Sequence, residues 1–228
     1  MKIPRLTPRL QKIYDAVPAC SCAADIGTDH AYIPVCLTLS EKCKRAVACD
    51  IKKGPLERAE KTIASYGAAD LVQTRLGGGL TPLAPDEADT IIIAGMGGLL
   101  IAQILSDCDM TAKSAKRLIL QPMTAAVELR EYLISNGYKI EKEYLAREDS
   151  KIYNIISAVP GKSEPYTAAQ LYIGCGLSGE ADFSQYYESR LKKLSRRIDG
   201  LTASKNPENH KKLRELEILK EMIENENF

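Results

Sequence analysis

The sequence has no tryptophan, and its 228 residues include only two phenylalanines and two histidines, against eleven tyrosines. It also lacks an excess of either charge, since 31 Lys and Arg face 30 Asp and Glu. Any surface that binds nucleic acid must therefore be a local cluster of basic residues, because the chain as a whole is not basic. The hydrophobic fraction of 45% is sufficient for a packed core. The length suits one α/β domain of ordinary size with a small appendage.

Long apolar segments are also missing. No run approaches the roughly 18 to 20 apolar residues that span a bilayer. The N-terminal segment is basic but has no apolar core of a signal peptide. It instead predicts a short amphipathic helix with Leu6, Leu10, Ile13 and Val17 on one side. We therefore expect a cytoplasmic protein with no membrane contact.

The cysteines lack a C-x-x-C pair, and their number is odd. Most of the seven lie inside apolar stretches: Cys20, Cys22, Cys36, Cys43, Cys49, Cys108 and Cys175. We expect them to be buried free thiols in a reducing compartment, and we expect no metal site.

Apolar segments of strand length alternate with helical segments along the first two thirds of the chain. Strands are predicted at 20–26, 45–50, 71–75, 90–94 and 117–121, and helices at 31–42, 55–66, 99–107 and 124–136. Two further strands, at 138–146 and 152–159, have no helix between them and predict an antiparallel hairpin at the sheet edge. The pattern indicates an α/β fold with a mostly parallel seven-stranded sheet and helices on both faces.

The character of the chain changes after Pro160 and Gly161, so we expect one domain over 1–161 and a second over 162–228. The second domain carries two apolar stripes at spacings of three and four. They consist of Phe183, Tyr187, Leu191, Leu194, Ile198 and Leu201, and then Leu213, Leu216, Leu219 and Ile223. These stripes predict an antiparallel helical hairpin of coiled-coil type.

The turn after the first strand reads Asp-Ile-Gly-Thr-Asp-His over 25–30 and is not a G-x-G-x-x-G turn. Its two acids would repel the pyrophosphate of a dinucleotide, which argues against an NAD-dependent dehydrogenase. They suit a cationic ligand with an amino-acid tail, such as S-adenosylmethionine, which carries a sulfonium and an ammonium. We expect Asp25 to hold the ammonium while Gly27 allows close approach of the backbone. Asp25 acting only as a helix cap is the alternative.

Three more signals follow the next three strands. Asp50 ends the second strand, where an acid accepts both ribose hydroxyls in doubly wound folds, and Ile51 would pack on the adenine. Glycine clusters follow the third and fourth strands, at 77–79 and 95–98. Four such turns in register predict a ligand crevice at the carboxyl ends of the strands. Simpler roles remain open: a cap for Asp50, a loose turn for 77–79, a structural His30 and a core-filling Met96.

Six segments stand in the order of a known family: DIGTDHAYIP (25–34), D-x-K-x-GPL (50–56), RLGGGL (75–80), IIIAGMGGLLI (91–101), RLILQP (117–122) and EDSKIYNI (148–155). Over nearly its whole length the chain resembles the bacterial tRNA adenine-N1-methyltransferases that act on adenine 22 of the D-arm. The resemblance implies a Rossmann-like class I methyltransferase fold, with S-adenosyl-L-methionine converted to S-adenosyl-L-homocysteine and no metal. The implied cofactor residues are Asp25, Gly27, Thr28, His30, Asp50, Ile51, Gly77, Gly78, Gly79, Ala94, Gly95, Met96 and Gly97.

The chain departs from the family pattern at four places. Cys49-Asp50 replaces Gly-Glu, which keeps the acid, and Ser150 replaces a glycine. Gly78 stands where the family usually has a polar residue that holds the cofactor adenine, so only backbone groups are left there. Met123 replaces an asparagine of the family.

Adenine N1 attacks through its lone pair, so the reaction requires no general base. We expect Asp29 to accept from the N6 amino group of the target adenine and to offset the charge of the methylated ring. A structural acid binding the N-terminal segment is the alternative. For tRNA we expect contacts from Arg5, Arg9, Arg147, Lys151, Arg190, Lys193 and Arg197, although the basic residues of the tail also fit a solvated helix face.

Two other functions remain open at this stage: methylation of another substrate, and a non-catalytic protein that binds RNA or a partner. We expect a monomer, since a hairpin within one chain needs no partner.

Overall fold

The computed structural model describes residues 3–204, 207–226 and 228. The chain divides into two compact units, Met1–Ser163 and Glu164–Phe228.

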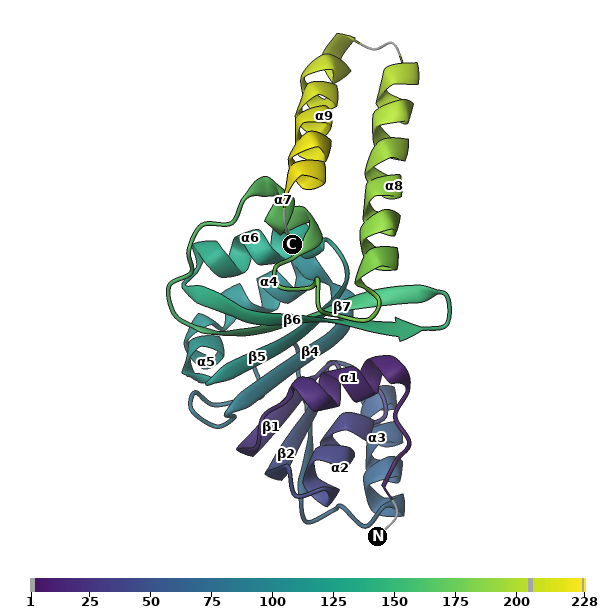
Figure 1. The fold of residues 1–228 in the computed structure, drawn as a ribbon. Helices are drawn as coiled ribbons and strands as arrows, with labels where there is room; N and C mark the ends of the chain where they lie inside the picture. Colours follow the sequence, from purple (N-terminus) through teal and green to yellow (C-terminus); the bar gives the residue numbers. More distant parts are fainter. Residues whose placement is uncertain (1–2, 205–206, 227) are drawn as a thin grey trace. The chain divides into compact units, whose positions relative to one another are not determined.

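The first unit is built around a seven-stranded sheet with the order β3-β2-β1-β4-β5-β7-β6 (Figure 1). The strands are β1 (Cys20–Ile26), β2 (Cys43–Asp50), β3 (Val72–Leu76), β4 (Thr90–Gly97), β5 (Arg117–Thr124), β6 (Tyr138–Glu148) and β7 (Lys151–Pro160). The first five are parallel, and β7 runs antiparallel to both β5 and β6. The predicted seven-stranded Rossmann-like sheet is confirmed, including its closing hairpin.

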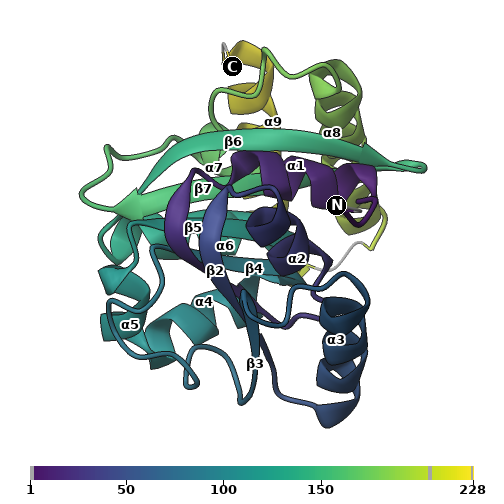
Figure 2. The ribbon, with the colours of Figure 1, turned by 90° about the horizontal axis from the view of Figure 1, so that it is seen from below.

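Helices cover both faces of this sheet (Figure 2). One face carries α1 (Pro8–Ala16), α2 (Tyr32–Leu39) and α3 (Lys53–Ser65), and the other carries α4 (Gly98–Asp107), α5 (Asp109–Ser114) and α6 (Ala126–Ser135). The sequence did not predict α5, because six residues are too short to show a helical period. The helix α1 begins at Thr7, whose hydroxyl accepts from the backbone N–H of Leu10, and Pro8 follows at a position that favours proline.

The connection between β3 and β4 contains no helix and is fastened by a charged pair. Arg75 donates from Nη1 to Glu87 at 2.8 Å and to the carbonyl of Pro82 at 2.8 Å. The hydrogen bonds from Arg75 hold the pKa of Glu87 at about 2, so this carboxylate stays ionised at any physiological pH. The pair therefore fixes the path of the glycine-rich segment that follows β3.

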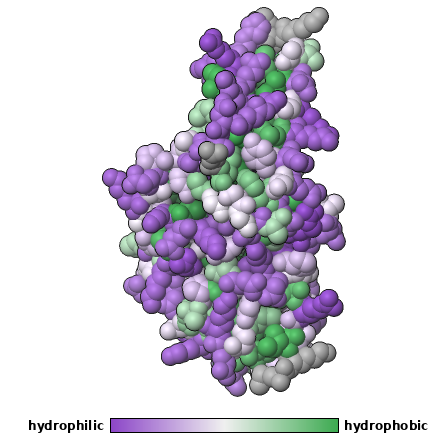
Figure 3. Space-filling view, viewed as in Figure 1, coloured by the Kyte–Doolittle hydropathy of each residue, from purple (hydrophilic) through white to green (hydrophobic). Residues whose placement is uncertain are grey.

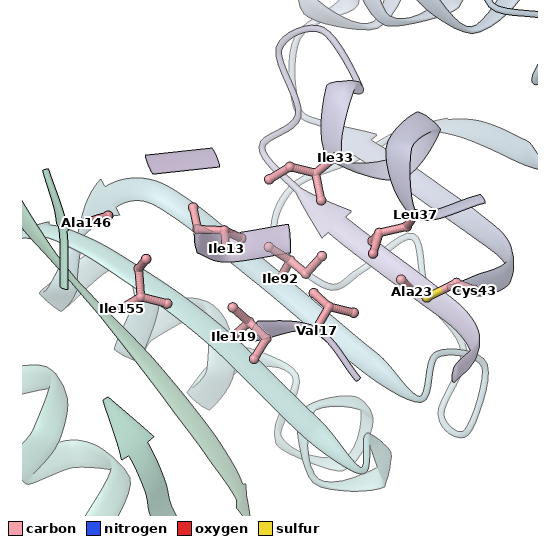
Figure 4. Close-up of a cluster of buried hydrophobic side chains, with 10 residues drawn as sticks. All are labelled: Ile13, Val17, Ala23, Ile33, Leu37, Cys43, Ile92, Ile119, Ala146 and Ile155. Atoms are coloured by element: carbon pink, nitrogen blue, oxygen red, sulfur yellow. The ribbon is translucent and has the colours of Figure 1, made fainter. Parts of the chain in front are cut away.

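A cluster of buried aliphatic side chains joins α1 and α2 to the sheet (Figure 4). Ile13 and Val17 from the N-terminal segment pack with Ile92 of β4 and Ile119 of β5. The predicted apolar side is confirmed for Leu10, Ile13 and Val17, whereas Leu6 precedes the helix and is not in this cluster. Each large aliphatic side chain removed from water contributes about 1.5–3 kcal/mol. The N-terminal helix is therefore an integral layer of the fold.

The second unit contains α7 (Ala168–Ile173), α8 (Phe183–Ala203) and α9 (His210–Asn225), with a short 3₁₀ turn at Pro207–Asn209. A capping box of Thr167 and Gln170 begins α7, a helix that the sequence did not predict. The predicted pair of long helices is confirmed, whereas its coiled-coil packing stays a prediction. Hydrophobic residues lie among hydrophilic ones along the C-terminal helices at the top of Figure 3, and Ile218 is 49% exposed.

The expectation that all seven cysteines are free thiols is wrong for one pair. Cys20 and Cys43 form a disulfide between the first residues of β1 and β2. The parallel register places these residues opposite each other, with their Cα atoms 4.8 Å apart, although 23 positions separate them in the sequence. Cys22, Cys36 and Cys49 are free thiols and are buried, as the sequence predicted for them.

A buried ion pair ties α6 to the edge hairpin. Arg130 and Glu143 are 0% and 1% exposed, and the guanidinium donates from Nε at 3.0 Å and from Nη2 at 2.7 Å. The Nη2 group also donates to Asn154 of β7 at 3.0 Å. Removing one partner of such a pair leaves an uncompensated buried charge, whereas removing both does not.

We predict that Arg130→Ala lowers the free energy of unfolding by about 3–5 kcal/mol, as measured by urea denaturation. The double variant Arg130→Met, Glu143→Leu should be distinctly more stable than Arg130→Ala, because it removes both charges and keeps apolar volume. If the double variant were less stable than Arg130→Ala, the cost of an unpaired buried charge would not explain the stability of the contact between α6 and the edge hairpin.

Candidate cofactor and substrate site

The carboxyl ends of the central parallel strands meet at one edge of the sheet. Ile26 at the end of β1 lies opposite Cys49 of β2 and Ile93 of β4. Consequently the turns that follow β1, β2 and β4 are neighbours in space, as the sequence predicted for a ligand crevice.

A pocket of about 340 Å³ opens at this edge. It is lined from the first helix, the turn after β1, the start of α2 and the end of β4, by Arg9, Leu10, Asp25, Gly27, Thr28, Asp29, His30, Ala31, Tyr32, Ile33, Ala94 and Gly95. Six of the predicted cofactor residues and Asp29 are thus brought together. Asp50, Ile51, Gly77, Gly78, Gly79, Met96 and Gly97 are not part of this lining.

Asp25 is the buried acid of the pocket, with 8% of its surface exposed. Burial raises the pKa of its carboxyl to about 6; a hydrogen bond from Thr28 opposes the shift, and the charge of Asp50 adds to it. The residue at the start of α2 is Ala31, and no side chain caps this helix. Asp25 is therefore not a helix cap, and its buried carboxylate gains most from a cationic ligand group.

The turn after β1 holds two residues with positive φ. Gly27 has φ +77°, a backbone conformation that disfavours any residue with a Cβ, and the terminal methyl of the flexible Met96 side chain lies where that Cβ would stand. Ala31 has φ 53°, which costs a residue with a Cβ about 1–2 kcal/mol. The hydroxyl of Thr28 accepts from the backbone N–H of Ala31 at 3.1 Å and holds this strained turn.

Asp29 is paired with Arg58 of α3, which donates to it from Nε at 3.0 Å and from Nη2. Nε2 of His30 lies 3.4 Å from the second carboxylate oxygen, and the His30 ring stacks on Tyr32 with centroids 5.2 Å apart. Arg58 was not predicted, because an arginine within a surface helix carries no signal of its own. Both partners of the Asp29–Arg58 pair are about half exposed.

The segments after β2 and β3 lie outside this lining and carry an exposed apolar side chain. Ile51 is 68% exposed, and a Cβ added to Gly78 would lie 3.3 Å from Ile51 Cδ1. A side chain at position 78 would therefore press against Ile51. Asp50 accepts from the backbone N–H of Lys52 through Oδ1 at 2.7 Å, so it also stabilises the local turn.

Gln121 of β5 is fully buried and links the first helix to the end of β4 through hydrogen bonds. Its Oε1 accepts from Arg9 Nη1 at 2.9 Å and from the backbone N–H of Gly95 at 3.2 Å. The backbone N–H of Arg9 donates to Glu148 at 3.1 Å. Sequence reasoning missed Gln121, although it lies in one of the segments that carry the family resemblance.

The predicted RNA-binding residues are distributed over both units. Arg5 is exposed in the N-terminal segment, and Arg147 and Lys151 lie in the β6–β7 hairpin. In the second unit, Lys193 and Arg197 are exposed one helical turn apart on α8. Arg190 instead stacks on the ring of Tyr172 and donates to the Tyr172 carbonyl at 2.8 Å.

Two negative findings concern only the described residues. Among them, no group of three or more His, Cys, Asp or Glu side chains is arranged to hold a metal ion. None of their helices is long and apolar enough to cross a membrane.

Residues 6–156 match the family model described as a methyltransferase domain. The chain is 34% identical to the tRNA (adenine(22)-N(1))-methyltransferase of Bacillus subtilis (strain 168), over 96% of this chain and 98% of that protein. The crystal structure of the B. subtilis m1A22 tRNA methyltransferase TrmK matches with a TM-score of 0.85 at 33% identity, over 96% of this chain and 99% of that one.

Another similar protein is Streptococcus pneumoniae Sp1610, a putative tRNA (m1A22) methyltransferase whose structure was solved in complex with S-adenosyl-L-methionine. It matches with a TM-score of 0.81 at 28% identity, over 96% of this chain and 99% of that one. Family model, identity and fold all agree with the family that the sequence motifs indicated. The chain therefore belongs to the methyltransferase-domain family and, within it, to the tRNA (adenine(22)-N(1))-methyltransferases.

Proposed function

We propose that this protein uses S-adenosyl-L-methionine to methylate N1 of adenine 22 in the D-arm of tRNA, releasing S-adenosyl-L-homocysteine. The observation that carries the proposal is the buried carboxyl of Asp25 in a pocket at the carboxyl ends of the strands, because a buried acid there fits a cationic ligand. The family membership supplies the target atom.

We further propose that the first domain, residues 1–161, binds the cofactor, which supplies a methyl group activated by a sulfonium. Asp25 would hold the ammonium of the cofactor, and Asp50 would accept from its ribose hydroxyls. The exposed Ile51 would pack on one face of its adenine, beside the space that Gly78 leaves open. The turns at 27–30, 77–79 and 94–97 would lie along the cofactor and contact it through backbone groups.

At the target base, the residues of the chain have to orient N1 and favour the positive charge that develops on the ring. Asp29 lies in the same pocket as Asp25, and its carboxylate is suited to accept from the N6 amino group. Release of Asp29 from its partner Arg58 needs little free energy, because both side chains are about half exposed. N1 lies on the Watson–Crick edge, so a paired or stacked adenine must first be exposed.

For tRNA itself, we propose contacts from Arg5, Arg147 and Lys151 of the first domain and from Arg190, Lys193 and Arg197 of the second, residues 162–228. The exposure of Lys193 and Arg197 on one side of α8 supports a role in binding phosphates. We also propose that the enzyme acts in the cytoplasm, where its substrate is found, and as a monomer, because α8 and α9 pair within one chain.

We predict that the purified protein transfers a labelled methyl group from S-adenosyl-L-methionine to unmodified tRNA, and that digestion yields 1-methyladenosine. A transcript with guanine at position 22 is the matched control and should stay unlabelled. Cofactor binding without any labelled product would contradict the proposed reaction and indicate another substrate or a non-catalytic role.

We predict that cofactor affinity depends on the ionisation of Asp25, whose pKa is about 6 in the free protein. Below pH 6 the carboxyl is neutral and must lose its proton to bind an ammonium, so the Kd should rise about tenfold per pH unit there and be level above about pH 7. Calorimetric titration between pH 5 and 8 measures this. In Asp25→Asn the affinity should be weaker and this pH dependence absent.

The same substitution should stabilise the cofactor-free protein. The folded-state pKa of Asp25 lies above its unfolded value of 3.8, so its contribution to stability is lost as the pH rises through about 6. At pH 7.5, Asp25→Asn should therefore raise the free energy of unfolding by roughly 1–3 kcal/mol. A loss of stability in urea denaturation would show that the buried charge is compensated within the protein.

We predict that Asp29→Ala lowers kcat by about 10²-fold or more, because a group aimed at developing charge is lost, and changes the Kd of the cofactor less than threefold. Arg58→Ala removes the partner and leaves the carboxylate, so its kcat should fall much less. Steady-state kinetics at saturating tRNA, with calorimetry for the cofactor, separates the two. Equal losses of kcat and cofactor affinity in Asp29→Ala would refute the role at the target base.

A further inference from the structure

We propose that the guanidinium of Arg9 binds the carboxylate of the methionine moiety of S-adenosyl-L-methionine, and that Arg9 is a cofactor-binding residue. This assignment replaces our expectation that Arg9 contacts tRNA. It rests on the proposed function, since it names a subsite for the same cofactor.

The charges in the pocket motivate the assignment. The lining contains two acids, Asp25 and Asp29, and Arg9 is the one Lys or Arg that lines it within the described part of the chain. The cofactor brings a carboxylate as well as its two cationic groups. The acids suit the cations, and the carboxylate needs a donor of positive charge because an unpaired ion away from water is costly. Arg9 supplies that charge within the same pocket.

The position of Arg9 is fixed by contacts within the protein. Nη1 donates to the buried Gln121, Nε lies 3.7 Å from the carboxylate of Glu148, and the guanidinium lies over the Tyr153 ring at 5.5 Å. Its side chain is 21% exposed. A guanidinium has five N–H donors, so these contacts leave donors for a ligand. A guanidinium that is held in place and largely buried suits a carboxylate in a pocket better than a phosphate on a surface.

The surroundings of Gly95 agree with this assignment. Gly95 has φ +78° and donates its N–H to the same Gln121 oxygen that accepts from Arg9. A Cβ built on Gly95 would find Arg9 Nη1 as its nearest neighbour, at 4.0 Å. No side chain therefore separates the guanidinium from the turn after β4. A ligand that lies along the turn after β4 can therefore contact the Arg9 guanidinium directly.

The test compares two ligands that differ only in the carboxylate: S-adenosyl-L-methionine and its decarboxylated analogue. By calorimetry, Arg9→Ala should raise the Kd of S-adenosyl-L-methionine about 10–100-fold, the range for loss of a charge-assisted hydrogen bond. The Kd of the decarboxylated analogue should change less than threefold. Arg9→Lys, which keeps the charge, should recover part of the affinity for S-adenosyl-L-methionine.

Two control variants separate this role from others. Lys12→Ala removes the same charge from the same helix, at a side chain that lies over the Tyr144 ring rather than in the pocket lining, and should leave both Kd values unchanged. The double variant Lys193→Ala, Arg197→Ala should weaken tRNA binding and leave cofactor binding intact. Arg9→Ala should show the opposite pattern.

Either of two results would overturn the proposal. Equal loss of affinity for both ligands in Arg9→Ala would mean that the pocket depends on Arg9 for its shape alone. Intact cofactor binding with weakened tRNA binding would return Arg9 to the RNA-binding residues. If the wild-type protein binds S-adenosyl-L-methionine but methylates no tRNA, only the proposed reaction fails, and the ligand comparison still decides the role of Arg9.

Discussion

The parallel pairing of β1 with β2 and β4 is the constraint on which the site depends. Hydrogen bonding in register sets the ends of these strands side by side, so that turns far apart in the chain lie at one edge of the sheet. The chain leaves each strand there with a glycine or an acid, and the helices return it to the opposite edge. The same pairing places Cys20 opposite Cys43 at that opposite edge.

The site carries features that oppose the stability of the cofactor-free protein. Asp25 is buried with a raised pKa, and Ala31 has a positive φ in the turn that follows. Such features persist where the surroundings hold them in place. The aliphatic cluster that joins α1 and α2 to the sheet provides that support, because it includes Ala23 of β1 and Ile33 of α2. A cationic ligand would relieve the buried charge, so binding and stability are linked at Asp25.

Much of the fold could be predicted from the sequence because its strands are short, strongly apolar and separated by clear turn residues. The strand at 20–26 was predicted with its observed bounds. β4 runs three residues further than predicted, to Gly97, because Met96 and Gly97 continue pairing with β5 through an irregular register. The helices α5 and α7 were missed, since six residues do not establish a period.

The order of the elements, the residues at the carboxyl ends of the strands and the family could all be inferred from the amino-acid sequence, because each of these depends on neighbouring positions along the chain. The pairs of side chains that meet are known only from the folded chain: Arg58 with Asp29, 29 positions apart, and Arg9 with Gln121, 112 positions apart. Such contacts depend on strand order, register and helix packing together. A single sequence records none of these three directly.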